Sequence, residues 1–447
     1  MSEKLFDILV DKMWKTKGSL FLVFPLAIMV LVFSLNSLND NIYKWIVGIC
    51  IATITIAYTV ATIKYNSLPK SNDCKKASIL LRIYAKNKEE YEDIKEKFGN
   101  EFNKFLAIGK NKTFDIVYIP YHLIENNKSD DLEDIIKMLK KTNCIFLATI
   151  KTKSEEMSTD TQYVTELNFG ILHNTYPEKV QELFQGEVNY WSRTTRRLEY
   201  SKMNKITTLE TTAEKLSLVC RYIIGCAYYL NGDLVNAGII IDELYNMLKA
   251  KSSDNFIKNL RDKSKALGFD IHIIKVHIEF SKDNPNLEFI KNELDKADNL
   301  IKNTYVYNLN MSTYAFLKNR DVISAKKYIG ACKSLEPNGE WKYSEAFLYA
   351  YEGESEGRVV YKYMQALKTD TDYMHLIAFI EDILLKEEDK IMLKFALAIL
   401  YIETGNIDAA KDTMSEYLKI KENAKLEVNT IKRLTKKYGQ DIIDKIL

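Results

Sequence analysis

The sequence predicts a mostly α-helical protein with two transmembrane helices, a small α/β sandwich domain and a long C-terminal region of helical repeats. The chain of 447 residues has only 6 prolines and 16 glycines, so few residues interrupt helices. Two long uncharged runs lie near the N-terminus, and helix–turn–helix patterns recur in the second half. The net charge of +2 gives no argument for nucleic-acid binding.

Two uncharged runs, 18–39 and 45–63, predict transmembrane helices at about 18–39 and 43–63, within an anchor of residues 1–67. Each run is close to the roughly 20 apolar residues that cross a bilayer. Lysines precede the first run and follow the second. By the positive-inside rule, both termini would lie in the cytoplasm of a multi-pass protein of a bacterial inner membrane. Neither run contains an ionisable residue, which favours a passive anchor over a pore.

A small α/β domain is predicted for residues 76–175. Stretches rich in β-branched and aromatic residues alternate with charged amphipathic segments, in the order β-α-β-α-β-β. The predicted strands lie at 78–85, 114–120, 144–149 and 162–172, and the predicted helices at 88–105 and 130–141. This order is typical of a two-layer sandwich and does not identify a function.

No motif in this domain indicates an enzyme. The sequence lacks a phosphate-binding glycine loop, a nucleophile elbow and a kinase catalytic loop. His122 and His173 are its histidines, and each fits a structural position near a strand end. We therefore predict no catalytic residue and no cofactor.

A connecting segment at 176–206 contains a cluster of arginines. Arg193, Arg196 and Arg197 lie close in sequence to aromatic residues, an arrangement that suits a phosphate or a carboxylate. The alternative is a solvated surface or ion pairs with neighbouring glutamates. These arginines are the candidate anion-binding site.

Residues 207–447 contain recurring helix–turn–helix patterns. In the first copy, the small residues Gly225 and Ala237 let two helices approach closely on either side of a turn. A later copy repeats this spacing of small residues, and two others match it less closely. The turns lie at Gly232-Asp233, Gly405-Asn406, Arg320-Asp321 and Gly353.

These patterns resemble the tetratricopeptide repeat, a helix–turn–helix unit of 34 residues with an alanine on its second helix. The resemblance covers about half of the chain, with uneven spacing between copies. It implies an α-solenoid whose concave face binds a peptide or a partner helix. The residues that it places on that face are Tyr222, Cys226, Tyr229, Asn310, Tyr314, Tyr343 and Phe347. The alternative, that these residues belong to the packed core, stays open.

Two further histidines, His272 and His277, lie between acidic residues. Metal-binding histidines on a helix are typically four residues apart, whereas these are five apart. We therefore predict no metal site.

The sequence thus predicts a membrane-anchored, cytoplasm-facing scaffold or adaptor that is not an enzyme and binds a protein or peptide through its repeats. The lipid bilayer is the other expected contact, and nucleic acid is not an expected partner. Two alternatives stay open: a ligand-sensing membrane effector of stress or phage defence whose hairpins perturb the bilayer, and an enzyme in the α/β domain. The oligomeric state, the pathway and the identity of any ligand or partner also stay open.

Overall fold

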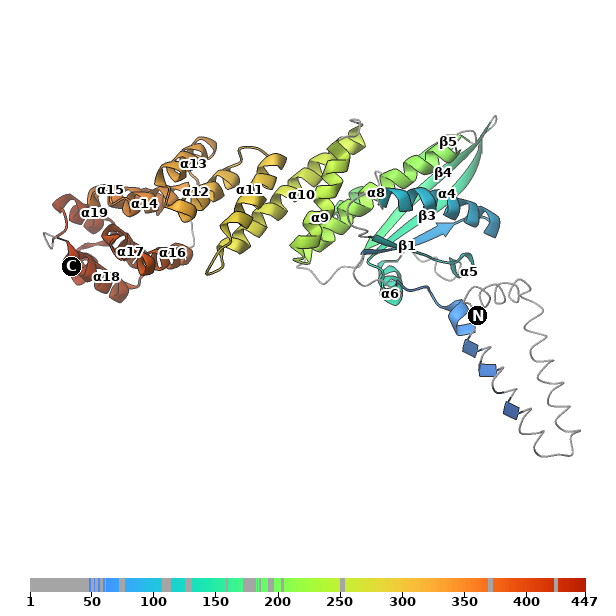
Figure 1. Cartoon of the computed structure of the whole chain (residues 1–447), viewed down its shortest axis with the longest axis horizontal. Coiled ribbons are helices and arrows are strands. Elements are labelled where there is room, and N and C mark those ends of the chain that lie inside the picture. Colours follow the sequence, from blue (N-terminus) through green and yellow to red (C-terminus); the bar gives the residue numbers. More distant parts are fainter. Residues whose placement is uncertain are drawn as a thin grey trace, which may run out of the picture. The chain divides into compact units, whose positions relative to one another are not determined.

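The computed structural model describes most of the chain from residue 62 to residue 447. The gaps are 72–76, 107–113, 125–130, 158–159, 172–181, 183, 185, 192–196, 202–204, 250–253, 369–372 and 422–424, and before residue 62 only 48, 49, 52, 55, 56, 59 and 60 are described. The chain divides into two compact units, Met1–Cys220 and Arg221–Leu447. The division falls inside helix α8 (Lys205–Leu230) (Figure 1).

The prediction of two transmembrane helices is corrected by the structure. Within the described part of the chain, no helix is long and apolar enough to cross a membrane. The helical residues that end the second run stop at residue 66, just after Lys64. The predicted span at 18–39 and much of the span at 43–63 lie outside the described residues. The fold class is therefore mostly α with a small sheet, and the assignment to an inner membrane with both termini in the cytoplasm is wrong.

The first unit contains a five-stranded sheet with the order β2-β1-β3-β4-β5. Its strands are β1 (Ala77–Tyr84), β2 (Phe114–Tyr118), β3 (Phe146–Met157), β4 (Asp160–Ile171) and β5 (Arg197–Ser201). Strand β1 pairs in parallel with β2 and β3, whereas β4 pairs antiparallel with β3 and β5. The predicted strands are found with shifted ends, and β5 was not predicted.

Helix α4 (Lys88–Leu106) packs on this sheet because its apolar residues recur every three or four positions. Tyr91, Ile94, Phe98 and Phe102 are buried on that face, and the Tyr91 hydroxyl donates to the Ile119 carbonyl at 2.7 Å. Helices α5 (Tyr121–Ile124) and α6 (Leu132–Thr142) also pack against the strands. Strand β1 is buried along nearly its whole length, as expected for a central strand covered by helices.

The second unit is helical and repeat-like, and is compatible with an α-solenoid (Figure 1). Its hairpins are α8 with α9 (Leu234–Lys249), α10 (Asn255–Phe280) with α11 (Leu287–Leu300), α12 (Tyr305–Asn319) with α13 (Val322–Leu335), α14 (Trp341–Tyr351) with α15 (Glu356–Ala366), and α17 (Ile391–Glu403) with α18 (Ile407–Ile420). Helix α16 (Tyr373–Lys386) lies between the last two hairpins, and α19 (Val428–Tyr438) and α20 (Gln440–Ile446) follow them.

The tight turns of these hairpins share one backbone geometry. Gly232 has φ +77° and Gly405 has φ +76°, in the left-handed region that glycine adopts without steric cost. After each glycine, Asp233 or Asn406 donates its backbone N–H to the carbonyl five residues earlier, which closes the first helix. The side chain of the same residue accepts a backbone N–H of the next helix and caps it.

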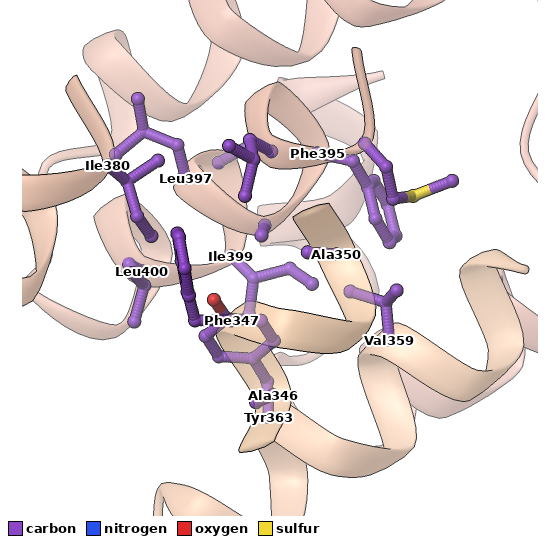
Figure 2. Close-up of a cluster of buried hydrophobic side chains, with 14 of the residues drawn as sticks. Ala346, Phe347, Ala350, Val359, Tyr363, Ile380, Phe395, Leu397, Ile399 and Leu400 are labelled. Atoms are coloured by element: carbon purple, nitrogen blue, oxygen red, sulfur yellow. The ribbon is translucent and has the colours of Figure 1, made fainter. Parts of the chain in front are cut away.

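Helix α17 is apolar over most of its surface, and other helices pack around it. It contacts α14, α15, α16 and α18, and its buried residues include Phe395, Leu397, Ile399 and Leu400. These side chains belong to one buried cluster with residues of α14, α15 and α16 (Figure 2). A helix enclosed in this way needs no polar stripe. The elements from α14 onward therefore share a common core.

Candidate functional site

An apolar cleft of about 290 Å³ lies among helices α12, α14 and α16. Large apolar side chains from all three helices form its walls. They are Leu309 and Phe316 from α12, Phe347 and Leu348 from α14, and Leu376 and Phe379 from α16. The cleft lies entirely within the second unit.

Three phenylalanines hold the helices around this cleft. The Phe316 ring centroid lies 4.9 Å from that of Phe347 and 6.2 Å from that of Phe379, and the Phe347 and Phe379 centroids are 5.1 Å apart. All three pairs meet edge to face, the arrangement that aromatic quadrupoles favour. One ring from each helix therefore fixes the positions of the cleft walls.

A polar latch, formed by Arg320, Tyr351 and Glu387, joins the ends of these helices. Arg320 Nε donates to Glu387 Oε1 at 2.6 Å, and the Tyr351 hydroxyl donates to Glu387 Oε2 at 2.6 Å. Burial raises the pKa of Glu387, but these two hydrogen bonds outweigh burial and lower it. The latch thus ties the segment after α16 to the end of α12 and to α14.

Few polar groups line the cleft, and most of them are uncharged. Thr313 and Ser344 line it as half-buried hydroxyls, and His375 lines it from an exposed position. Glu340 adds a carboxylate. Glu340 precedes α14, whereas His375 lies on α16. The cleft is therefore suited to binding an apolar side chain rather than to acid–base chemistry.

The structure brings two of the predicted groove residues to this cleft. Tyr343 and Phe347 line it from α14. Asn310 and Tyr314 lie on α12 but pack away from it. Tyr314 belongs to a core cluster with residues of α10 and α11, and the Asn310 amide donates to the Val306 carbonyl at 2.8 Å.

The other predicted groove residues lie on α8, away from the cleft. Tyr222 and Cys226 are buried, and Tyr229 is half-buried. Sequence reasoning missed Leu309, Phe316, Leu376 and Phe379 as site residues. The sequence signal that could have identified such residues is the apolar stripe of α16, which lies between the hairpins recognised from the sequence.

The predicted anion site lies mostly outside the described residues. Arg193 and Arg196 are among those left undescribed. Arg197 begins β5, where its backbone is paired with that of Glu166. His173 is also outside the described part, whereas His122 stacks on Tyr65 at 3.8 Å between ring centroids.

His272 lies in a buried ionic network rather than in a metal site. Its Nδ1 is 2.8 Å from Glu293 Oε2 on α11, and its Nε2 is 3.1 Å from Asp242 Oδ1 on α9. The carboxylates face opposite edges of the ring and do not converge on one point. Burial lowers the pKa of His272, but these hydrogen bonds outweigh burial and raise it. Among the described residues, no cluster of three metal-ligating side chains occurs.

No known protein family, curated protein or solved structure matches this chain. A functional assignment therefore depends on the geometry and chemistry of the cleft itself.

Proposed function

We propose that this protein is a helical-repeat adaptor that binds a segment of a partner protein in the cleft between α12, α14 and α16. The observation that supports this most directly is the apolar cleft itself, walled by Phe316, Phe347 and Phe379. Apolar pockets with a few polar groups at their edges are typical ligand sites. In protein recognition, a few bulky side chains buried in such pockets supply most of the binding energy.

The chemistry of the lining indicates the occupant. The ring-lined walls suit a leucine, phenylalanine or tryptophan side chain, which would be removed from water on binding. The hydroxyls of Thr313 and Ser344 stand beside these walls and suit the backbone of an incoming peptide. Glu340 favours a basic residue next to the apolar anchor.

We infer in addition that the hairpins are degenerate tetratricopeptide-like repeats. The shared turn geometry supports this, and so does the close packing of small residues. A Cβ atom at Gly225 would lie only 2.5 Å from Ile241 Cδ1, and Ala237, Ala325 and Ala410 are each fully buried (0% exposed). In such arrays the first helices of the hairpins line the concave binding face, which is the role we assign to α12 and α14.

A peptide library displayed on phage, selected against the full-length protein, tests this function. Ser344→Trp places an indole in the cleft, and Thr313→Trp does so from α12. Ser334→Trp on the exposed part of α13 is the matched control. We expect enriched peptides to share a bulky apolar residue, and to bind both cleft variants at least about tenfold more weakly than the control.

Two results would overturn the proposal. One is that no peptide is enriched on the wild-type protein. The other is that enriched peptides bind the folded Ser344→Trp and Thr313→Trp variants as tightly as the wild type. Circular dichroism of each variant shows whether the substitution leaves the helices intact.

A further inference from the structure

A second pocket, separate from the cleft, lies in the first unit beside α5 and α6. Its volume is about 490 Å³, which is within the size range of small-molecule sites. Three lysines, Lys70, Lys140 and Lys141, line it, and its described lining contains no acidic residue. The pocket is therefore strongly basic.

The segment that contributes Lys70 is fixed on both sides of the pocket. The Tyr65 carbonyl accepts a hydrogen bond from His122 Nε2 at 2.8 Å, and the two rings stack with 3.8 Å between their centroids. Farther along, Ser71 donates its backbone N–H to the Thr142 carbonyl at 2.8 Å. These contacts hold residues 66–70 against α5 and the end of α6. Lysines from two separate segments therefore meet at one place.

The helix dipole accounts for two of these lysines but not for the third. Lys140 and Lys141 lie in the last turn of α6, where positive charge is favourable. Lys70 is not on this helix, and it adds a third positive charge to the same pocket. None of the three pairs with an acidic side chain in the described part of the chain, whereas Lys137, one turn earlier on α6, pairs with Glu133 at 2.9 Å. Because like charges repel, an anion that joins the three lysines would be stabilised here.

We propose that this pocket binds a small soluble compound that carries two or more phosphate groups. Lysine ammonium groups bind phosphate as point charges and need no fixed orientation. A ligand with more than one phosphate contacts Lys70 and the lysines of α6 at the same time. The side-chain amide of Asn66 lines the pocket as a further donor. No aromatic ring is among the described lining residues, so we expect an inorganic or aliphatic phosphate rather than a nucleotide whose base stacks.

Binding in this pocket would tie two segments of the first unit together. The ligand would bridge residues 66–70 and the last turn of α6, next to the hydrogen bond from Ser71 to Thr142. A ligand that binds only the folded arrangement stabilises it in proportion to its occupancy. The Ser71 amide is therefore expected to exchange its hydrogen more slowly in the complex.

Calorimetric titration of inorganic diphosphate into the full-length protein tests this inference. Lys70→Gln and Lys141→Gln each remove one charge at an exposed position. Lys137→Gln is the matched control, because it removes an exposed charge from the same helix outside the pocket. We expect saturable binding to the wild type, an unchanged affinity in Lys137→Gln, and an affinity at least about fivefold lower in each pocket variant.

A variant of unchanged charge separates a pocket from a diffuse basic surface. Asn66→Trp places an indole in the pocket and is expected to weaken binding at least about tenfold. Circular dichroism shows whether each variant is folded, and hydrogen exchange follows the Ser71 amide. Absence of diphosphate binding to the wild type, equal weakening in Lys137→Gln, or full affinity in folded Asn66→Trp would overturn the inference. Binding to phosphatidylcholine vesicles that contain phosphatidic acid, without binding to diphosphate, would also overturn it.

Discussion

His272 is held by carboxylates on both sides, and a protonated ring donates to both of them from its two nitrogens. Its pKa is raised because these hydrogen bonds outweigh burial. A raised pKa in the folded state means that the stabilisation is fully present below the ordinary value of 6.5 and is lost as the pH rises through the folded value. Lys275 and Lys296 also pair with Glu293, so that carboxylate keeps partners when His272 loses its proton.

We therefore expect the free energy of unfolding to fall as the pH rises above 6.5. Urea denaturation at a series of pH values measures it. His272→Gln removes this part of the pH dependence and is less stable than the wild type at pH 6. An unchanged slope in His272→Gln would refute the role of the network.

Glu293 contributes to the pH dependence of the free energy of unfolding with the opposite sign from His272. Burial raises the pKa of Glu293, but hydrogen bonds from His272 and Lys296 outweigh burial and lower it to about 2. A lowered pKa contributes stability that is present above the ordinary value of 4.5 and lost as the pH falls toward 2. In the same urea experiment, Glu293→Gln should therefore lose less of its free energy of unfolding than the wild type as the pH falls below 4.5. A loss of stability at low pH as large in this variant as in the wild type would contradict this role of Glu293.

Tyr363 and Tyr417 are both buried tyrosines with opposite hydrogen-bonding states. No partner is found for the Tyr363 hydroxyl among the described residues, whereas the Tyr417 hydroxyl donates to Glu356 at 2.7 Å. Tyr363→Phe should leave the free energy of unfolding unchanged or raise it by about 1 kcal/mol. Tyr417→Phe should lower it by about 1.5–3 kcal/mol, because it leaves a buried carboxylate with one partner fewer. Urea denaturation of the two variants measures the contrast, and equal losses would contradict it.

At the scale of elements, glycines in turns and helices respond oppositely to the same substitution. Gly232 and Gly405 have positive φ values, so Gly232→Ala and Gly405→Ala should each destabilise by about 1 kcal/mol or more. Gly330 lies in α13 with open space where a Cβ would be, so Gly330→Ala should stabilise by about 0.5–1 kcal/mol. Thermal unfolding measures all three, and a destabilised Gly330→Ala variant would contradict the assignment.

The hairpins were predictable because their turns are local. Gly232-Asp233 and Gly405-Asn406 carry the glycine and the capping residue next to each other in sequence. The cleft was not predictable, because Phe316, Phe347 and Phe379 meet only through contacts between helices distant in sequence. Tyr222 and Cys226 were predicted on the concave face but are buried. The repeat pattern gives the helix position of a residue, and it does not show whether a neighbouring helix covers that position.

At the scale of the whole molecule, the two apolar runs near the N-terminus lie mostly outside the described residues. The runs at 18–39 and 45–63 have the composition of spans. No helix in the described part of the chain is long and apolar enough to cross a membrane. The cleft lies in the unit Arg221–Leu447, so the proposed adaptor activity belongs to the helical unit.

The central claim is that the cleft between α12, α14 and α16 binds an apolar segment of another protein. Calorimetric titration of one library-selected peptide into the full-length protein tests it most directly. We predict saturable binding to the wild type and to Ser334→Trp, and at least about tenfold weaker binding to Ser344→Trp. Equal affinity for the three proteins, with all three folded, would contradict the claim.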